Sequence, residues 1–169
     1  MMDSEPQTHR NERLAVLMQS VGFAVWQLQE LETSVATYLV IRVHAHRGIG
    51  TVPGEQLINK AEGRTLGSLV TELAKSGVID GQLSVDLREV LEQRNWLVHR
   101  ARRENRGILA SPKQFSELLV RLEALAHRSL ELLKEVASGI ENHVLSCGVD
   151  RRTIDSEADR LARSWALFE

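Results

Sequence analysis

The segment from Leu14 to Val43 constrains the fold most, because it contains no proline and its apolar residues recur every three, four or seven positions. This spacing is typical of one long amphipathic helix. At 1.5 Å per residue such a helix is about 45 Å long, which exceeds the width of a small domain. The chain therefore has to fold along a rod. The apolar residues that define it are Leu14, Leu17, Val21, Val25, Leu28, Val35, Leu39 and Val43.

A second rod is predicted from Pro112 to Ser146, with Gly139 as a possible bend. Its start is marked by the sequence Ser111-Pro112-Lys113-Gln114, in which a capping serine precedes a proline at the first helical position. Two rods of this length in a small protein leave ends that one protomer does not cover. We therefore expect the chain to form a homodimer.

The remaining segments also have helical patterns. Ser84 is the expected cap of a central helix that runs to about Arg103, and Thr65 that of a shorter helix up to Lys75. Further helices are expected over residues 55–61 and 152–167, with a glycine-rich loop at 47–54. No segment alternates as a strand does. The predicted fold is an all-α helical bundle with two long helices and a central motif helix.

Length and composition set the organisation of the chain. A chain of 169 residues with 43% hydrophobic residues suits a single domain, which we place at residues 11–169 after a flexible polar lead at 1–10. No stretch reaches the roughly 18 apolar residues of a membrane span, and the lead does not resemble a secretory signal. We therefore expect a cytoplasmic protein without membrane contact. Cys147 is the single cysteine, and no ligand cluster predicts a metal or another cofactor.

The residues with the clearest chemical potential are Arg94, Asn95 and His99, close together on the central helix. Arginine binds phosphate through a fixed fork of donors, and histidine exchanges protons near neutral pH. At 100° per residue, Arg94 falls inside an apolar arc about 120° wide, and Trp96 points away from that arc. An unpaired buried charge is costly, so Arg94 has to find a partner or an opening. Trp96 is expected to be exposed unless a second element or a dimer contact covers it.

Basic residues are concentrated around this motif. The formal net charge is −2, yet five arginines occur between positions 94 and 106, against one acid, Glu104. Because arginine favours bidentate contact with phosphate, this segment predicts a nucleic-acid-binding surface. The residues expected to contact RNA are Arg88, Arg100, Arg102 and Arg103.

The sequence Arg-Asn-x-x-x-His, late in a helix, resembles the signature of the HEPN superfamily, a group of helical domains in prokaryotic toxins and antiviral ribonucleases. The stretch LREVLEQRNWLVHR carries the likeness, and RTLGSLVTEL upstream is similar to a segment of some stand-alone members; the likeness as a whole spans roughly residues 64–103. An Arg-to-His gap of four to six residues also occurs at Arg121 and His127, so the adjacent Asn95 supplies the specificity. Ala101 replaces the tyrosine that many toxin members carry, which removes one known mode of control.

The resemblance implies metal-independent RNA cleavage at a composite site between two protomers. His99 would then act as the general acid or base, Arg94 would stabilise phosphate charge, and Asn95 would hold the substrate or the histidine. Glu30 and Glu32 on the first helix are candidate partners of Arg94, and the resemblance favours Glu32. An antitoxin or another protein of a defence complex is a possible further partner. The alternative is a catalytically silent domain that keeps the motif to bind RNA or a protein partner.

Overall fold

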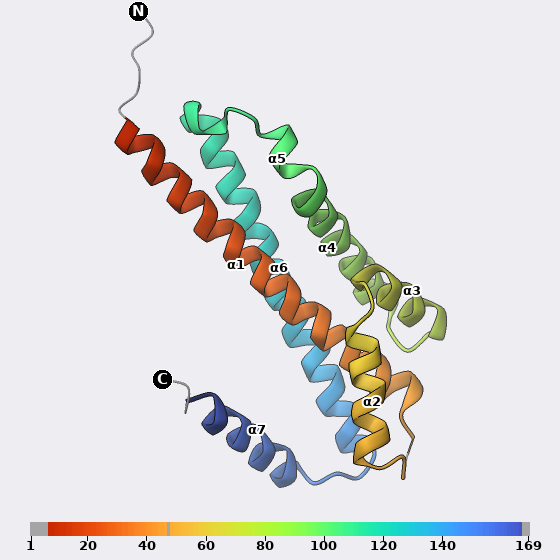
Figure 1. Cartoon of the computed structure of the whole chain (residues 1–169). Helices are drawn as coiled ribbons and strands as arrows, with labels where there is room; N and C mark the ends of the chain where they lie inside the picture. The colour runs from red at the N-terminus through yellow and green to blue at the C-terminus, as the bar shows by residue number, and fades with distance from the viewer. Residues whose placement is uncertain (1–6, 47, 167–169) are drawn as a thin grey trace, which may run out of the picture.

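The computed structural model describes residues 7–46 and 48–166, and in these residues it contains helices and turns but no strand. The all-α prediction is therefore confirmed. Three long elements lie roughly along one direction and form the body of the molecule, while two of the shorter helices, α2 (Thr51–Glu62) and α3 (Leu66–Ser76), lie at one end (Figure 1). Residues 1–6 of the predicted polar lead lie outside the described part of the chain.

The first rod is α1, Gln7–Leu39, which continues through a π-helical turn, Val40–His44. The predicted long helix is thus confirmed, although it begins inside the lead that was expected to be flexible. Its C-terminal half is deeply buried, with Leu31, Val35 and Leu39 fully inaccessible. Its N-terminal half is more open, because fewer elements surround it (Figure 1).

The second rod is α6, Pro112–Ser146, and it begins with the predicted cap: the Ser111 side chain accepts a hydrogen bond from the backbone N–H of Gln114. Helix α6 runs beside α1 in the same direction (Figure 1). At Gly139 the two helices approach closely, since a Cβ atom there would lie 2.8 Å from Cε2 of Tyr38. Gly139 therefore serves close packing.

The central motif helix is α4, Gly81–His99, which runs antiparallel to both rods (Figure 1). Its cap is Asp80, whose carboxylate accepts from the backbone N–H of Leu83 at 2.7 Å, so the prediction of Ser84 as the cap was wrong. The helix also ends earlier than predicted. Arg100 interrupts it with φ −124° and ψ −31°, and a short helix, α5, Ala101–Glu104, follows. The 3₁₀ turn η2, Ile108–Ala110, then leads into α6.

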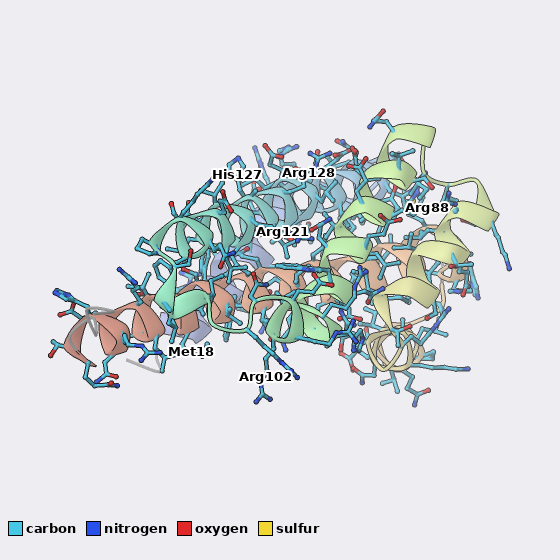
Figure 2. The ribbon with its side chains drawn as sticks, turned by 90° about the horizontal axis from the view of Figure 1, so that it is seen from above. Met18, Arg88, Arg102, Arg121, His127 and Arg128 are labelled. Carbon is cyan, nitrogen blue, oxygen red and sulfur yellow. The ribbon has the colours of Figure 1, made fainter. Side chains whose placement is uncertain are left out.

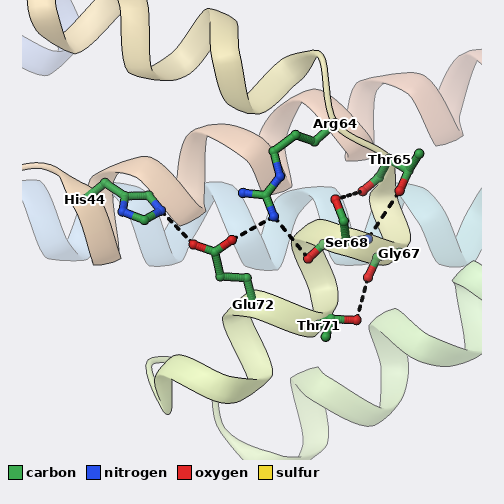
Figure 3. Close-up of polar contacts among 7 residues, drawn as sticks. All are labelled: His44, Arg64, Thr65, Gly67, Ser68, Thr71 and Glu72. Carbon is green, nitrogen blue, oxygen red and sulfur yellow. Dashed lines mark hydrogen bonds and ion pairs between the residues drawn. The ribbon is translucent and has the colours of Figure 1, made fainter.

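Two short helices, α2 at Thr51–Glu62 and α3 at Leu66–Ser76, pack at the other end of the bundle. Helix α2 starts inside the segment that was predicted to be a loop. Glu72 of α3 joins this region together: its carboxylate pairs with Arg64 at 2.7 Å and with Nε2 of His44 at 2.8 Å (Figure 3). Helix α3 is thus tied to the end of the first rod.

The core lies between α1, α3, α4 and α6. The last helix, α7, Arg151–Ala166, diverges from the bundle (Figure 1) and is anchored at its start by an ion pair between Arg151 and Glu141. Among the described residues, no helix is both long and apolar enough to cross a membrane. The fully buried leucines at the centre are Leu31, Leu39, Leu66, Leu69, Leu73, Leu87, Leu122 and Leu132.

Candidate functional site

The three motif residues occupy the last two turns of α4. Asn95 and His99 are exposed, and Arg94 is half-buried. The Arg94 guanidinium donates to Oδ1 of Asn95 at 3.3 Å, so these two neighbours form one polar unit. His99 is the last residue of α4 and makes no side-chain hydrogen bond within the described residues.

The directions of these side chains differ. At 100° per residue, Asn95 and His99 are about 40° apart around the helix axis, whereas Arg94 and His99 are about 140° apart. The Cα–Cβ bonds of Asn95 and His99 therefore point to one face, and that of Arg94 points toward the apolar side. The Arg94 side chain bends back from there, because its guanidinium reaches Oδ1 of Asn95.

Trp96 is buried, with only 3% of its surface exposed, because a second element covers it, which is one of the two alternatives that the sequence left open. It is covered by α6, so the motif helix is enclosed on a second side. The guanidinium of Arg121 lies 3.3 Å from the centre of the Trp96 ring, and Nε1 of Trp96 donates to Glu104 at 2.7 Å. Val98, two positions later, is by contrast 54% exposed although it is apolar.

Arg121 of α6 was missed by sequence reasoning, which connected it only with His127. Its guanidinium donates twice to Oε1 of Gln93, at 2.8 and 3.1 Å, while it stacks on Trp96. Partial burial lowers the pKa of Arg121, and the positive charge of Arg100 acts in the same direction, against the attraction of Glu104. A guanidinium keeps its proton at physiological pH despite such a change. No local sequence signal links Arg121 to the motif, because 25 positions separate it from Trp96.

The arginines expected to contact RNA are all exposed. Among the described residues, none of these four forms an ion pair with a carboxylate. Arg102 projects away from the ribbon, on the side of the molecule where Met18 also lies (Figure 2). By contrast, Arg128 on α6 binds Asp86 at 2.7 Å and Glu131 at 3.0 Å. The four free arginines are Arg88, Arg100, Arg102 and Arg103.

An apolar groove of about 260 Å³ lies beside the motif, between the N-terminal half of α1, the α4–α5 junction and α6. Met18 and Leu14 are 54% and 43% exposed near it. Sequence reasoning assigned Leu14 to the buried stripe and missed the groove. The sequence did contain a signal for an exposed apolar surface here, because α1 carries no charged residue between positions 14 and 29. The groove is lined by Leu17, Met18, Val21, Leu97, Ala101, Arg102, Asn105, Ile108, Leu118 and Leu122.

Glu32 occupies a different place from the one predicted. Its carboxylate accepts a hydrogen bond from the backbone N–H of Leu66 at 2.6 Å and thereby caps α3. In the described part of the chain, no ion pair joins it to Arg94. Glu32 therefore supports the site only at a distance, by holding α3, whose Gly67 packs against Leu91 of the motif helix.

The surroundings of the motif contain few acids. Within residues 7–46 and 48–166, no group of three or more His, Cys, Asp and Glu side chains is arranged to hold a metal ion. Comparison with known proteins gives no further assignment, because no family model, curated protein or solved structure matches this chain. The case for a function therefore rests on the residues and their geometry.

Proposed function

We propose that this protein is a metal-independent endoribonuclease of the HEPN type, which acts as a toxin or in antiviral defence. The observation that carries the proposal is the exposed Asn95–His99 face of α4, next to Arg94 and bordered by arginines without carboxylate partners. Among the described residues no carboxylate pairs with these arginines, whereas an anionic polymer would supply phosphates for them to bind.

RNA suits this residue set because it carries its own nucleophile. A general base removes the proton of the 2′-hydroxyl, whose oxygen then attacks the adjacent phosphorus. The bond from phosphorus to the 5′-oxygen breaks, and a general acid protonates that oxygen. The products are a 2′,3′-cyclic phosphate and a 5′-hydroxyl. A guanidinium such as that of Arg94 stabilises the additional negative charge of the phosphorane.

The reaction needs a base and an acid at the same time, and each protomer has one histidine in the motif. A homodimer supplies two His99 side chains and two Arg94 side chains to one phosphate. The backbone positions of Arg94 and His99, about 140° apart around the axis of α4, favour this arrangement. The uncharged stretch at 14–29, with Met18 exposed beside the groove, supports self-association on this side of the molecule.

Cleavage assays with matched variants test the proposal. The wild type, His99→Ala, Arg94→Ala and His127→Ala are incubated with RNA in EDTA, and the ends are analysed for cyclic phosphate. His127 is the control, because it is an exposed histidine on α6 paired with Glu131. We expect cleavage by the wild type and His127→Ala only, with all four proteins dimeric by light scattering. Cleavage by His99→Ala at the wild-type rate would refute the catalytic assignment.

The alternative function is a silent HEPN-like domain that binds RNA, an antitoxin or a defence-complex protein without cleaving RNA. The presence of a single motif histidine in each chain favours it, because one imidazole does not serve as base and acid at the same time. The same assay separates the two functions: RNA binding that depends on Arg102 and Arg103, together with no cleavage by the wild type, supports the silent domain.

A further inference from the structure

The motif helix ends at a defined break. Arg100 leaves the helical conformation, and its backbone N–H still bonds the carbonyl of Trp96 at 2.8 Å. Helix α5 starts at Ala101, with the N–H of Glu104 bonded to the carbonyl of Arg100 at 3.0 Å. His99 is the last residue before this break. The position of its ring therefore depends on how firmly the chain is held on both sides of Arg100.

Three side chains hold the chain around this break. Arg121 of α6 lies on the Trp96 ring and binds Gln93, which fixes the last turns of α4. Trp96 in turn donates to Glu104, the residue at the end of α5, at 2.7 Å. This connection crosses the break, so the direction of α5 is tied to that of α4. We call Arg121, Trp96 and Glu104 the clamp.

We propose that Arg121 is a positioning residue for His99, which acts through Trp96 and Glu104 to fix the chain at the break. His99 makes no side-chain hydrogen bond among the described residues, so the backbone at the break sets the direction in which its Cα–Cβ bond points. The surroundings make the clamp more than a surface ion pair, because the ring of Trp96 is buried and Arg121 makes three contacts at once. A cation–π contact is stronger when it is desolvated, and hydrogen bonds from a guanidinium are stronger than those between neutral groups.

A matched control exists on the same two helices. Arg128 of α6 binds Asp86 of α4 at 2.7 Å and so joins α6 to α4 as Arg121 does, but in the first third of α4 rather than near the break. If Arg121 only held the two helices together, its loss and the loss of Arg128 would have the same effect on His99. If Arg121 positions His99, only the loss of Arg121 should affect that residue. The consequence for catalysis rests on the proposed function, whereas the effect on His99 does not.

The experiment compares Arg121→Gln with Arg128→Gln in the full-length protein. The readouts are the NMR chemical shift of His99 Cε1–H and the amide hydrogen exchange of residues 97–106. We expect Arg121→Gln to move the His99 signal and to accelerate exchange about tenfold, as the loss of a partly buried contact would. Arg128→Gln should leave both unchanged. In RNA cleavage, Arg121→Gln should lower kcat about tenfold with little change in KM.

Trp96→Phe gives an independent test, because it keeps a ring for Arg121 to stack on and removes the N–H that donates a hydrogen bond to Glu104. It should accelerate exchange at 101–106 more than at 93–97. The inference is overturned if Arg121→Gln leaves the His99 signal and the exchange unchanged, or if Arg128→Gln alters them equally. A wild type that cleaves no RNA would overturn the proposed function, and the NMR and exchange data would still decide on the clamp.

Discussion

The two ends of the bundle differ in how their charged side chains are paired. At the α3 end, Glu72 joins Arg64 and His44, and along α4 the nearly buried Asp86 pairs with Arg128. At the motif end, residues 94–106 contain five arginines and one acid, Glu104, which bonds Trp96. The arginines of the motif end are therefore not neutralised by the fold.

The apolar surface follows the same division. From Leu28 on, toward α3, α1 buries its core side, whereas Leu14, Met18, Phe23 and Trp26 earlier in the helix are exposed. One end thus has the features of a folding core, with paired charges and close packing. The other end has unpaired cations beside uncovered apolar surface, which is typical of a surface that binds a partner. The difference indicates where stability and where binding should be lost on mutation.

The largest contrast should come from two apolar residues of the same helix. Leu87 is fully buried in α4, so Leu87→Ala should cost about 3 kcal/mol of unfolding free energy through lost contacts and a cavity. Val98, eleven residues later, is 54% exposed, and Val98→Ala should cost under about 0.5 kcal/mol. Urea denaturation measures both. Equal losses would mean that Val98 is covered, for example by a second copy.

Two glycines within long helices should respond to alanine with opposite signs. A Cβ at Gly139 would lie 2.8 Å from the Tyr38 ring, so Gly139→Ala should destabilise the protein by about 1–3 kcal/mol. At Gly22 nothing lies within 4 Å of that position, and Gly22→Ala should stabilise α1 by about 1 kcal/mol. Thermal unfolding decides the signs. Stabilisation at both sites would show that α1 and α6 are not closely packed at Tyr38.

The charged cluster at the α3 end should give a modest dependence of stability on pH. The hydrogen bond from Arg64 holds the pKa of Glu72 below its usual value of 4.5. A depressed folded pKa means that ionised Glu72 stabilises the fold above the unfolded pKa and that this contribution disappears as the pH falls through the folded pKa. Glu72→Gln should therefore cost under about 1 kcal/mol at pH 7.

This cost of Glu72→Gln should vanish in acid. Glu117→Gln is the control, because Glu117 forms only an exposed ion pair with Lys113 at 3.9 Å. It should change stability little at any pH. A loss in Glu72→Gln that persists below the folded pKa would assign the effect to packing instead of charge. Denaturation curves at several pH values provide the comparison.

The smallest effect on stability is expected at the motif end. Arg102→Gln with Arg103→Gln should change the unfolding free energy by under about 0.5 kcal/mol, because both side chains are exposed and lack carboxylate partners. The salt dependence of RNA binding should change instead, with a slope reduced by about 1.4 for two phosphate contacts on a single strand. Arg160→Gln, which breaks an exposed pair with Glu157 on α7, should leave that slope unchanged.

Prediction from sequence worked where the signal is local. The spacing of apolar residues predicted α1 and α6, and the Ser111-Pro112 sequence predicted the start of α6, because helix periodicity and capping depend on near neighbours. The same local signal misled at Ser84, since Asp80 upstream offered a capping carboxylate and the helix began earlier. Several residues near the start of a helix can act as its cap, and the sequence alone discriminates weakly between them.

The candidate site was likewise predictable from the sequence only in part. Arg94, Asn95 and His99 are identifiable because six consecutive positions hold them. Their environment cannot be identified from the sequence, because the burial of Trp96 and the exposure of Val98 depend on where α6 and α1 lie.

By itself, the sequence determined the helical class, the two rods and the position of the motif on its own helix. These properties arise from residues a few positions apart. Only the tertiary structure decided that Glu32 caps α3, that Arg121 holds Trp96, and that the apolar groove opens beside the arginines. Each of these contacts joins residues far apart in the chain, and such contacts form only after the helices pack against one another.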